Sequence, residues 1–525
     1  MGILTADERR FAEAVSTLAY CNPFTPERLA AERKALGSAF VDRGPVWSGL
    51  TPGAPNPNVI NLNPPLEAWI ERVRQRLVDQ PEAASAGERR LYGDLALYML
   101  YNRFDDDLVR LIDSNKLNQK VSFYSAYARD HRRLTDLPGP PVLVAAQADP
   151  AHCFAAMFQI RRAFNHIYTA IIGTSAPAGR LRASVWQSVF THDMRRYQRA
   201  LYQRMSDFTT LILGPSGTGK ELVARAIGLS RYIPFDGESA RFNDDPSGAF
   251  HPLNLSAMSP TLIESELFGH KRGAFTGALG DRAGWLEVCK PYGTVFLDEI
   301  GELDPAIQVK LLRVLQSRTF QRIGDTDHKP FHGKIVSATH RDLMAGIAEG
   351  HFRQDLYYRL CADLVTTPSL RTQLDDAPGD VETLVWHLAG KVAGPRQGAA
   401  FERDGGFGQG DTEVVDGLAE EVLRWINTQM PADYPWPGNV RELEQCVRNV
   451  AIRGSYTPQA EGVRPDTGPL GPLHREMQRG SLTAEEVVGR YVAHVYDQTG
   501  NYVEAARRVG LDRRTVKRHV DQVRG

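Results

Sequence analysis

A glycine-rich run of the sequence has the residue types that bind phosphate. Thr210–Leu213 is predicted to form a strand and Leu222–Ile227 a helix. A strand, a glycine-rich loop and a helix in this order form the context of a P-loop, in which backbone N–H groups and the helix N-terminus surround phosphate oxygens. Lys220 is placed to reach the outer phosphates; a plain glycine-rich turn is the alternative. The loop consists of Gly214, Pro215, Ser216, Gly217, Thr218, Gly219, Lys220 and Glu221, and the general motif has Ser or Thr where Glu221 stands.

Two acidic residues follow a second apolar run. Thr294–Leu297 is continuously apolar, as is typical of a buried parallel strand, and it ends in Asp298 and Glu299. An acid at the carboxyl end of a strand beside a P-loop can hold Mg²⁺ through its water shell, and a second acid can act as the base for an attacking water. Two solvated acids before a helix are the alternative. A further strand, Lys334–Thr339, ends at His340, which we expect to face the same phosphates.

A short run between these two motifs has an unusual composition. Glycine lets the backbone turn sharply and expose itself, so one aromatic side chain between two glycines can be pressed against a partner. The alternative is an ordinary turn whose Phe folds back into the core. The run consists of Gly273, Ala274, Phe275, Thr276, Gly277 and Ala278.

Length and composition bound the possibilities. A chain of 525 residues is expected to hold several domains, and its apolar fraction of 42% and charged fraction of 24% are typical of a soluble globular protein. The net charge of −1 means that any nucleic-acid contact must be local. The five cysteines lack metal-type spacing, which favours a reducing cytoplasm without a disulfide framework. We expect no membrane span and no signal peptide.

The first 168 residues are predicted to be mostly helical. Apolar residues recur at helical spacing from Leu66 to Leu77, and Arg90–Phe104 and Cys153–Tyr168 have similar patterns. The Pro-rich segment Pro45–Pro65 is predicted to be a surface loop, and Val142–Ala145 a short strand. The region is either a helical packing domain or a sensor, and the sequence does not identify a signal.

The C-terminal end has the pattern of two crossing helices. Gly510 makes a turn between them, and Asp512 can cap the second helix. Residues 500–525 hold seven Arg or Lys against three acids, or about +4, which fits DNA binding. A solvated basic helix is the alternative. The predicted DNA-reading residues are Arg513, Arg514, Thr515, Lys517 and Arg518.

Residues 169–456 resemble the AAA+ domain of bacterial enhancer-binding proteins, the activators of sigma-54 RNA polymerase. Glu264–His270 leads into Gly273–Ala278, which resembles the family's sigma-contacting loop, and Gly293–Leu303 resembles its Walker B segment. Phe352–Leu360 resembles the arginine-finger segment, and Trp436–Leu443 resembles the sensor II segment of the lid. A P-loop that ends in Glu also fits this family, and the C-terminal pattern resembles its Fis-type helix-turn-helix.

The resemblance implies a role for each matching residue. Lys220 would bind the β- and γ-phosphates of ATP, Asp298 would serve Mg²⁺, and Glu299 would activate water. Asn254 would pair with Glu299. Arg353 and Arg359 would contact the nucleotide bound by the next subunit. Arg441 would contact the nucleotide bound by its own subunit.

The sequence departs from the family pattern at a few places. His340 stands where the family usually has asparagine, and this puts the coupling of hydrolysis to loop movement in question. Phe235–Phe250 resembles an acidic insertion, and Gly394–Asp411 a flexible insertion within the lid.

The predicted fold class is an α/β AAA+ P-loop domain with a helical lid, a mainly helical N-terminal region and a C-terminal helix-turn-helix. The resemblance implies a cytoplasmic activator that forms a hexameric ring, binds upstream double-stranded DNA, and uses ATP and Mg²⁺ to remodel the sigma-54 closed complex. The alternatives are an AAA+ remodelling ATPase with another target and a DNA-binding repressor with a vestigial ATPase. The predicted divisions are residues 1–168 (N-terminal region), 169–361 (ATPase subdomain), 362–456 (lid), 457–480 (linker) and 481–525 (helix-turn-helix).

Overall fold

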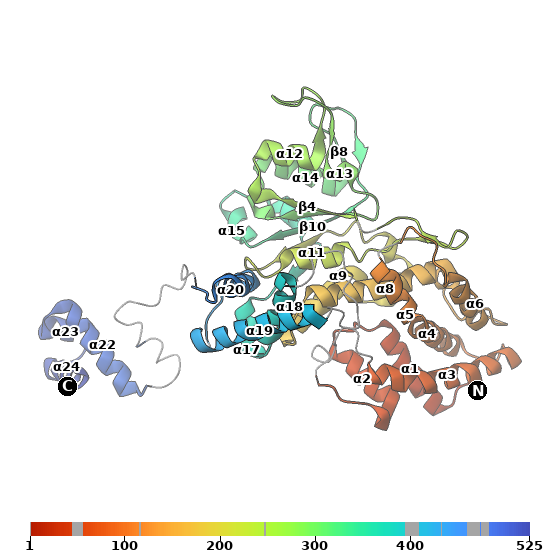
Figure 1. Ribbon diagram of the computed structural model, residues 1–525, viewed down its shortest axis with the longest axis horizontal. Helices are drawn as coiled ribbons and strands as arrows, with labels where there is room; N and C mark the ends of the chain where they lie inside the picture. Colours follow the sequence, from red (N-terminus) through yellow and green to blue (C-terminus); the bar gives the residue numbers. More distant parts are fainter. Residues whose placement is uncertain are drawn as a thin grey trace. The chain divides into compact units, whose positions relative to one another are not determined.

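The computed structural model describes residues 2–44, 56–114, 117–245, 248–393, 409–431, 433–458, 473 and 482–524 (Figure 1). The chain divides into two compact units, Met1–Gly454 and Ser455–Gly525. Within the described residues, no helix is both long enough and apolar enough to cross a membrane. The domain boundaries predicted inside the first unit stay predictions.

The first unit begins with a helical region, as predicted. Leu66, Trp69 and Val73 are buried along one side of α3, which explains the helical spacing of its apolar residues. Capping boxes at Thr5 and Ser85 begin α1 and α4. The helices are α1 (Ala6–Tyr20), α2 (Pro26–Leu36), α3 (Pro57–Asp79), α4 (Ala86–Arg103), α5 (Asp105–Ser114), α6 (Tyr124–Thr135), α7 (Ala145–Ala148), α8 (Pro150–Ala170), α9 (Ala176–Phe190) and α10 (Met194–Arg199).

Two local predictions in this region are wrong. Residues 45–55 of the Pro-rich segment lie outside the described residues, and the segment is helical from Pro57 onward, with Pro64 and Pro65 inside α3. Pro57 takes the first helical turn, where a missing N–H costs nothing, and the buried apolar side of α3 outweighs the two hydrogen bonds that the inner prolines remove. The strand predicted at Val142–Ala145 does not form either, because Ala145 opens the short helix α7.

A five-stranded parallel sheet forms the centre of the first unit. The strand order is β11-β1-β10-β7-β4. All neighbours are parallel, so the carboxyl ends of the strands meet at one edge. β7 and β10 are buried on both faces, which accounts for the continuous apolar run Thr294–Leu297 of β7. The strands are β1 (Thr210–Leu213), β4 (Phe250–Asn254), β7 (Thr294–Asp298), β10 (Lys334–Thr339) and β11 (Asp363–Thr366).

Helices cover both faces of this sheet (Figure 1). Ile212, Phe296 and Val336 pack on α8, α9 and the P-loop helix α11 (Lys220–Gly228). Their neighbours Leu211 and Ile335 face the other side. The helices on that side are α12 (Pro260–Phe268), α13 (Trp285–Val288), α14 (Pro305–Ser317), α15 (Leu343–Ala348) and α16 (Gln354–Leu360), accompanied by the two-stranded ladders β5–β6 (Gly269–His270, Arg282–Ala283) and β8–β9 (Thr319–Phe320, Lys329–Pro330).

The predicted insertion after α11 forms a small hairpin, β2 (Phe235–Asp236) and β3 (Arg241–Phe242). The Phe235 ring lies 4.7 Å from that of Phe154, and the Phe242 ring 4.5 Å from that of Phe158. Phe154 and Phe158 belong to α8, so the hairpin closes the hydrophobic core of the N-terminal helices. The N-terminal helices and the domain built on the parallel sheet therefore share a hydrophobic core.

A helical subdomain follows the sheet. Its helices are α17 (Leu370–Asp376), α18 (Asp380–Ala393), α19 (Gln409–Gln429) and α20 (Asn439–Arg453), and α18, α19 and α20 pack against one another. Most of the flexible insertion predicted at Gly394–Asp411 lies outside the described residues, while residues 409–411 open α19.

The described part of the second unit includes the helices α22 (Ala484–Thr499), α23 (Tyr502–Val509) and α24 (Arg513–Arg524). Ala505 of α23 is fully buried with Val516 and Val520 of α24, so the small alanine lets the two helices approach closely. The linker predicted at residues 457–480 lies almost entirely outside the described residues.

The shared core gives a stability prediction. Phe242→Ala is expected to lower the free energy of unfolding of the first unit by about 3 kcal/mol, because it leaves a cavity among packed aromatic rings. The matched control is Phe208→Ala, since Phe208 is 42% exposed; its effect is expected to stay within about 0.5 kcal/mol. Urea unfolding of both variants measures the difference, and equal effects would show that the hairpin adds nothing to the N-terminal core.

Candidate functional site

The parallel register brings four strand ends together. Leu213 of β1 pairs with Thr339 of β10, and Ala338 of β10 pairs with Asp298 of β7. Asp298 in turn pairs with Asn254 at the end of β4. The P-loop, both acids and His340 therefore lie at one edge of the sheet, where parallel α/β proteins bind ligands.

The glycines of the loop after β1 are required by its backbone. Gly214, Gly217 and Gly219 have φ angles of 150°, 77° and 84°, in the region that favours glycine. A Cβ atom at Gly214 would collide with the Thr367 hydroxyl, and one at Gly217 with the carbonyl of Gly438. The loop thus needs glycine both for its shape and for its neighbours.

Lys220 begins the helix after this loop and is only 7% exposed. Its ammonium group donates to the carbonyls of Gly214 and Pro215, at 3.0 and 3.1 Å. Burial lowers the pKa of Lys220, and the nearby Glu299 and Asp298 partly oppose this shift. The cation therefore lies along the loop and close to the two acids, whereas Glu221 in the next position is exposed.

The two acids have different surroundings. Burial raises the pKa of Asp298, and the adjacent Glu299 raises it further. Glu299 has a φ of 57°, a left-handed conformation that turns its carboxylate toward the end of β10. That carboxylate accepts hydrogen bonds from the His340 ring at 2.8 Å, the His340 backbone N–H at 3.3 Å and the Thr339 hydroxyl at 3.4 Å. A carboxylate only accepts, so Nδ1 of His340 carries the proton in this bond.

The predicted pairing of Asn254 with Glu299 is not formed in this structure. Oδ1 of Asn254 accepts from the backbone N–H and the hydroxyl of Ser256, at 3.0 and 2.8 Å. This local turn caps the short helix at Leu255–Ala257. His340 is the partner that the sequence analysis missed, although its position had been noted as a departure.

The helical subdomain contacts the glycine-rich loop directly. Arg441 donates from its guanidinium group to the Ser216 hydroxyl at 3.0 Å and from its backbone N–H to the Gly217 carbonyl at 3.4 Å. Asn439 donates to the Ser216 carbonyl at 2.9 Å and accepts from the Leu370 N–H at 2.8 Å. Thr218 and Thr367 share a hydroxyl hydrogen bond of 2.7 Å. Sequence reasoning found Arg441 but neither Asn439 nor Thr367, because their contacts arise only from tertiary packing.

The two predicted finger arginines belong to the segment of α16. Arg353 is the residue just before the first turn of this helix, and it forms a two-pronged ion pair with Asp355, at 3.0 and 2.7 Å. Arg359 is exposed on the same helix. Within the described residues, neither side chain is hydrogen-bonded to the P-loop or to the two acids. Their predicted reach into a neighbouring subunit stays a prediction.

The Gly273–Ala278 run joins β5 to β6 as a closed loop. Gly273 and Gly277 have φ angles of 80° and 100°, and the Gly273 N–H donates to the Ala278 carbonyl at 2.9 Å. Phe275 is half-buried, and its ring meets the edge of the His270 ring at 4.9 Å. The Phe275 ring therefore packs against His270 at the base of its own loop, and it belongs neither to the buried core nor to the fully exposed surface. The exposed apolar side chain here is Leu279, at 89% exposure.

Known proteins resemble this chain over its central part. The sigma-54 interaction domain family matches residues 188–365. The transcriptional regulatory protein ZraR of Escherichia coli is 38% identical over 316 residues, which are 59% of this chain and 62% of ZraR. The sigma-54-dependent transcriptional activator SfnR of Pseudomonas putida is 37% identical over 301 residues, which are 57% of this chain and 72% of SfnR. The chain belongs to the sigma-54-dependent transcriptional activators.

This membership confirms the family predicted from the motifs, and with it the AAA+ α/β fold of the central region. A Nif-specific regulatory protein of Herbaspirillum seropedicae is also similar, at 42% identity over 243 residues, or 46% of this chain and 38% of that protein. The chain spans 62% of the length of its ZraR relatives. The family match covers the site at the sheet edge and the Gly273–Ala278 loop, both of which fall within residues 188–365.

The site geometry predicts distinct outcomes for its two central residues. Lys220→Ala is expected to lose ATP binding, because it removes the cation that lies along the loop. Glu299→Gln is expected to bind ATP normally but to lose turnover by at least about 10²-fold, because an amide cannot take a proton from water.

Binding of a fluorescent ATP analogue and release of phosphate measure the two effects. Glu302→Gln is the matched control, since Glu302 lies three residues away and pairs with Arg341. Its turnover should equal that of the unaltered chain. Normal turnover in purified Glu299→Gln would remove Glu299 as the base.

Proposed function

We propose that this chain is an ATP-driven transcription activator that binds upstream DNA, assembles into a ring and remodels the closed complex of sigma-54 RNA polymerase. The observation that carries the proposal is one sheet edge that holds a P-loop lysine and two acids, in a chain that also has the Gly273–Ala278 loop. Membership of the sigma-54-dependent activators supports the choice of partner.

The sheet edge fits a nucleotide with its metal. Asp298 is a partly buried carboxylate beside the lysine, and oxygen ligands of this kind suit Mg²⁺. No cluster of three or more metal-type ligands occurs among the described residues, which fits an ion held mainly by phosphates and water. When bound, Mg²⁺ would neutralise charge on the β- and γ-phosphates. Lys220 would hold the same phosphates, and Glu299 would take the proton of the attacking water.

His340 connects the nucleotide site with the rest of the domain. It holds the Glu299 carboxylate at 2.8 Å, and Glu299 is followed by the short helix Ile300–Glu302. That helix touches the turn at Leu255–Ala257, which leads through α12 to β5 and the Gly273–Ala278 loop. If the Glu299 carboxylate changes its hydrogen-bond partner during hydrolysis, the change can therefore alter the position of the Gly273–Ala278 loop.

Exposed arginines support assembly into a ring. Arg353 and Arg359 lie on the surface of the first unit, where a second copy could bring its nucleotide to them. A guanidinium group matches phosphate oxygens, and fingers of this kind are worth about 10³–10⁵ in turnover. Arg441, which already touches the P-loop, would serve the nucleotide of its own subunit. A hexamer is the ring size that we propose.

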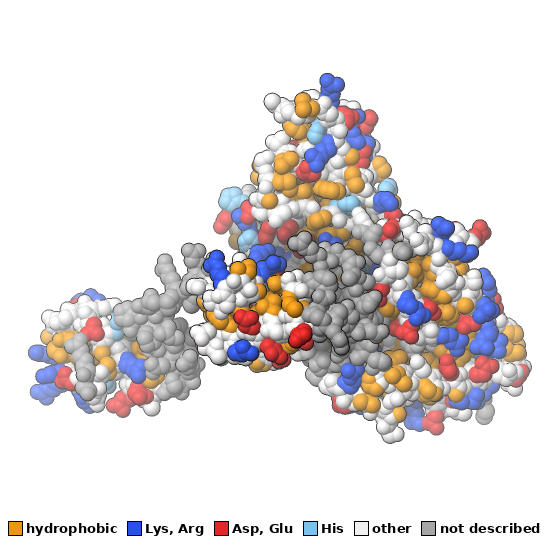
Figure 2. Space-filling view, viewed as in Figure 1, with side chains coloured by type: hydrophobic (Ala, Val, Ile, Leu, Met, Phe, Trp, Pro, Cys, Tyr) orange, Lys and Arg blue, Asp and Glu red, His pale blue; other side chains and the backbone are white. Residues whose placement is uncertain are grey.

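The second unit fits double-stranded DNA. Asp512 caps α24 by accepting from the N–H groups of Arg514 and Thr515, at 2.9 and 3.0 Å. Figure 2 shows basic side chains gathered along the edge of this unit. A second helix with an exposed basic face is the form of a recognition helix. Among the side chains of α24 that the structure describes, the exposed basic ones are Arg513, Arg514, Lys517 and Arg518.

The loop gives a prediction about the partner. Phe275→Ala is expected to weaken binding to sigma-54 at least tenfold, because a buried aromatic side chain is worth roughly 1.5–3 kcal/mol. ATP turnover and DNA binding should remain. Met344→Ala is the control, since Met344 is 52% exposed elsewhere on the same domain. Affinity for purified sigma-54 in the presence of ATP measures the effect, and unchanged affinity in Phe275→Ala would show that the loop does not contact sigma-54.

The basic helix gives a second prediction. Removing one phosphate contact, with Arg514→Ala or Lys517→Ala, is expected to reduce the salt slope of DNA binding by about one unit. Arg453→Ala, an exposed change outside the second unit, should leave the slope unchanged. Binding to an upstream promoter fragment at several salt concentrations measures the slope. A chain that ends at Gly480 and still binds that fragment with full affinity would place the DNA contact elsewhere.

A further inference from the structure

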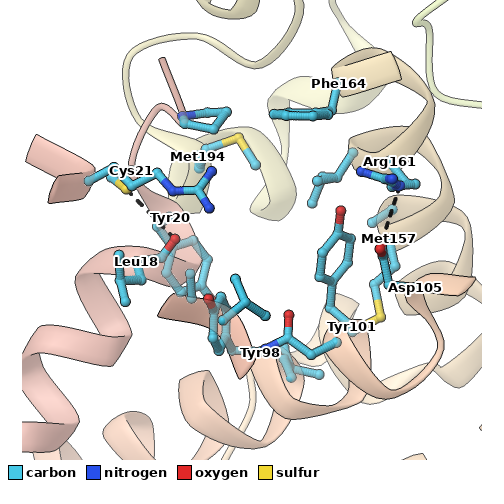
Figure 3. A pocket seen from close by; sticks show the side chains of 18 of the residues that line it. Leu18, Tyr20, Cys21, Tyr98, Tyr101, Asp105, Met157, Arg161, Phe164 and Met194 are labelled. Atoms are coloured by element: carbon cyan, nitrogen blue, oxygen red, sulfur yellow. Dashed lines mark hydrogen bonds and ion pairs between the residues drawn. The ribbon is translucent and has the colours of Figure 1, made fainter. Parts of the chain in front are cut away.

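The N-terminal helices enclose a cavity of about 500 Å³, which no part of the proposed activity uses (Figure 3). Its wall is formed mainly by α1, α3, α4 and α8. The volume lies in the range of small-molecule sites, which are mostly apolar with a few polar groups. The lining combines aliphatic side chains with six aromatic ones: Tyr20, Tyr98, Tyr101, Phe164, Tyr168 and Trp186.

Three of the four residues of the lining that carry a full charge are paired, and the fourth, Asp106, is exposed to solvent. Arg161 forms an ion pair with Asp105 at 3.1 Å, and Arg28 forms one with Glu32 at 2.9 Å. Burial lowers the pKa of His152, so its ring is neutral at neutral pH. A charged ligand would lose its hydration among these paired groups, where the nearest unpaired charge is the solvated carboxylate of Asp106, so the cavity favours a neutral ligand.

One polar group of the wall is available to a ligand. Tyr101 points into the open space of the cavity (Figure 3). Burial raises the pKa of its phenol, which therefore keeps its proton, and among the described residues its hydroxyl has no hydrogen-bond partner. A phenol O–H can donate to a carbonyl or similar acceptor on a bound molecule.

We propose that this cavity binds a neutral, planar aromatic molecule with a hydrogen-bond acceptor, and that its occupancy is transmitted through α8 to the P-loop helix α11. The second half of the proposal rests on the proposed nucleotide-binding function. Flat aromatic molecules fit a space lined by aromatic rings because offset stacking and edge contacts add to the burial of apolar surface.

Helix α8 links the cavity to α11, because one side of α8 lines the cavity and another side packs against α11. Met157, Arg161 and Phe164, at helical spacing, line the cavity. On the side toward α11, Ala163 and Ile167 share a buried core with Ile227 of that helix.

Hydrogen bonds reinforce this contact beyond the end of α11. Gln159 of α8 donates to the Ser230 carbonyl at 2.9 Å, and Arg162 donates to the Arg231 carbonyl. Both α8 residues are almost fully buried. Packed interiors transmit small displacements. A ligand that displaces the cavity side of α8 therefore shifts the position of α11, the helix that begins at Lys220.

The binding half is tested with Prodan, a neutral naphthalene dye that carries a carbonyl group and whose emission shifts to the blue in apolar surroundings. Titration of the full chain is expected to show a saturable blue shift with one site per chain. Ala156→Trp, which fills the cavity from α8, is expected to weaken binding at least tenfold. Ala30→Trp, an exposed change in α2, is the matched control and should leave the affinity unchanged.

A smaller change covers the case in which tryptophan is not accommodated. Ile160→Phe, also in the wall, is expected to weaken binding at least threefold while the thermal unfolding midpoint stays near that of the unaltered chain. Absence of saturable Prodan binding, or equal affinity in the folded cavity-filling variants and the Ala30→Trp control, would overturn the proposal.

The polar contact has its own test. Tyr101→Phe is expected to weaken Prodan binding about threefold to tenfold, which is the usual net worth of one hydrogen bond. The same variant should leave unchanged the affinity for 2-(dimethylamino)naphthalene, which has the same ring system without the carbonyl group. An equal loss for both dyes would refute the role given to the hydroxyl.

The coupling half is tested by reciprocity. Saturating Prodan is expected to change the affinity of the full chain for ATP at least threefold, and saturating ATP should change the affinity for Prodan by the same factor. Lys220→Ala should bind Prodan normally and lose the effect of ATP. Unchanged ATP affinity with the cavity filled would refute the coupling. If the chain binds no ATP, the proposed function fails, whereas the Prodan measurements still decide the binding half.

Discussion

The parallel register of β1, β10 and β7 is the constraint on which the rest of the structure depends. It sets Leu213 beside Thr339 and Ala338 beside Asp298, so residues that are 126 and 40 positions apart in the sequence meet at one edge. A shift of one residue in this register would turn each buried strand side chain to the opposite face of the sheet. The two cores on the faces of the sheet therefore stabilise the same alignment that brings Lys220 to Glu299.

Glu299 shows how this alignment is used. Its left-handed backbone is rare for a residue with a side chain, and such a conformation persists only where neighbours hold it. Here Thr339 and His340 hold its carboxylate from the end of β10. The histidine that departs from the family pattern is thus a structural partner of the acid, and the exchange of partners during hydrolysis need not begin from Asn254.

The N-terminal helices are joined to the ATPase-type domain through packing as well as through the chain. The β2–β3 hairpin places two phenylalanines among the rings of the N-terminal core, and α8 packs on α11. These helices could therefore alter the nucleotide site without moving as a separate body. Such a shared core suits a region that sets the activity of the domain according to what occupies its cavity.

Much of the fold and the site follows from local sequence patterns. The P-loop, the acidic strand end, the helical N-terminal region and the identity of the family are all read from short motifs or periodic apolar residues. The prolines of α3 were misread because local propensity was outweighed by the burial of Leu66 and Trp69. The contacts of Asn439 and Thr367, the pairing of Glu299 with His340 and the cavity beside α8 depend on how distant segments pack, which no short window of the sequence contains.

The most direct test of the central claim is promoter opening in a purified system. The full chain would be added to a closed complex of sigma-54 RNA polymerase on promoter DNA that includes the upstream region, with unpaired thymines detected by permanganate. We predict opening with ATP, and none with a non-hydrolysable analogue or with a polymerase that carries a different sigma factor. Opening that occurs without hydrolysis, or a closed complex that stays closed although the assembled chain hydrolyses ATP, would contradict the account.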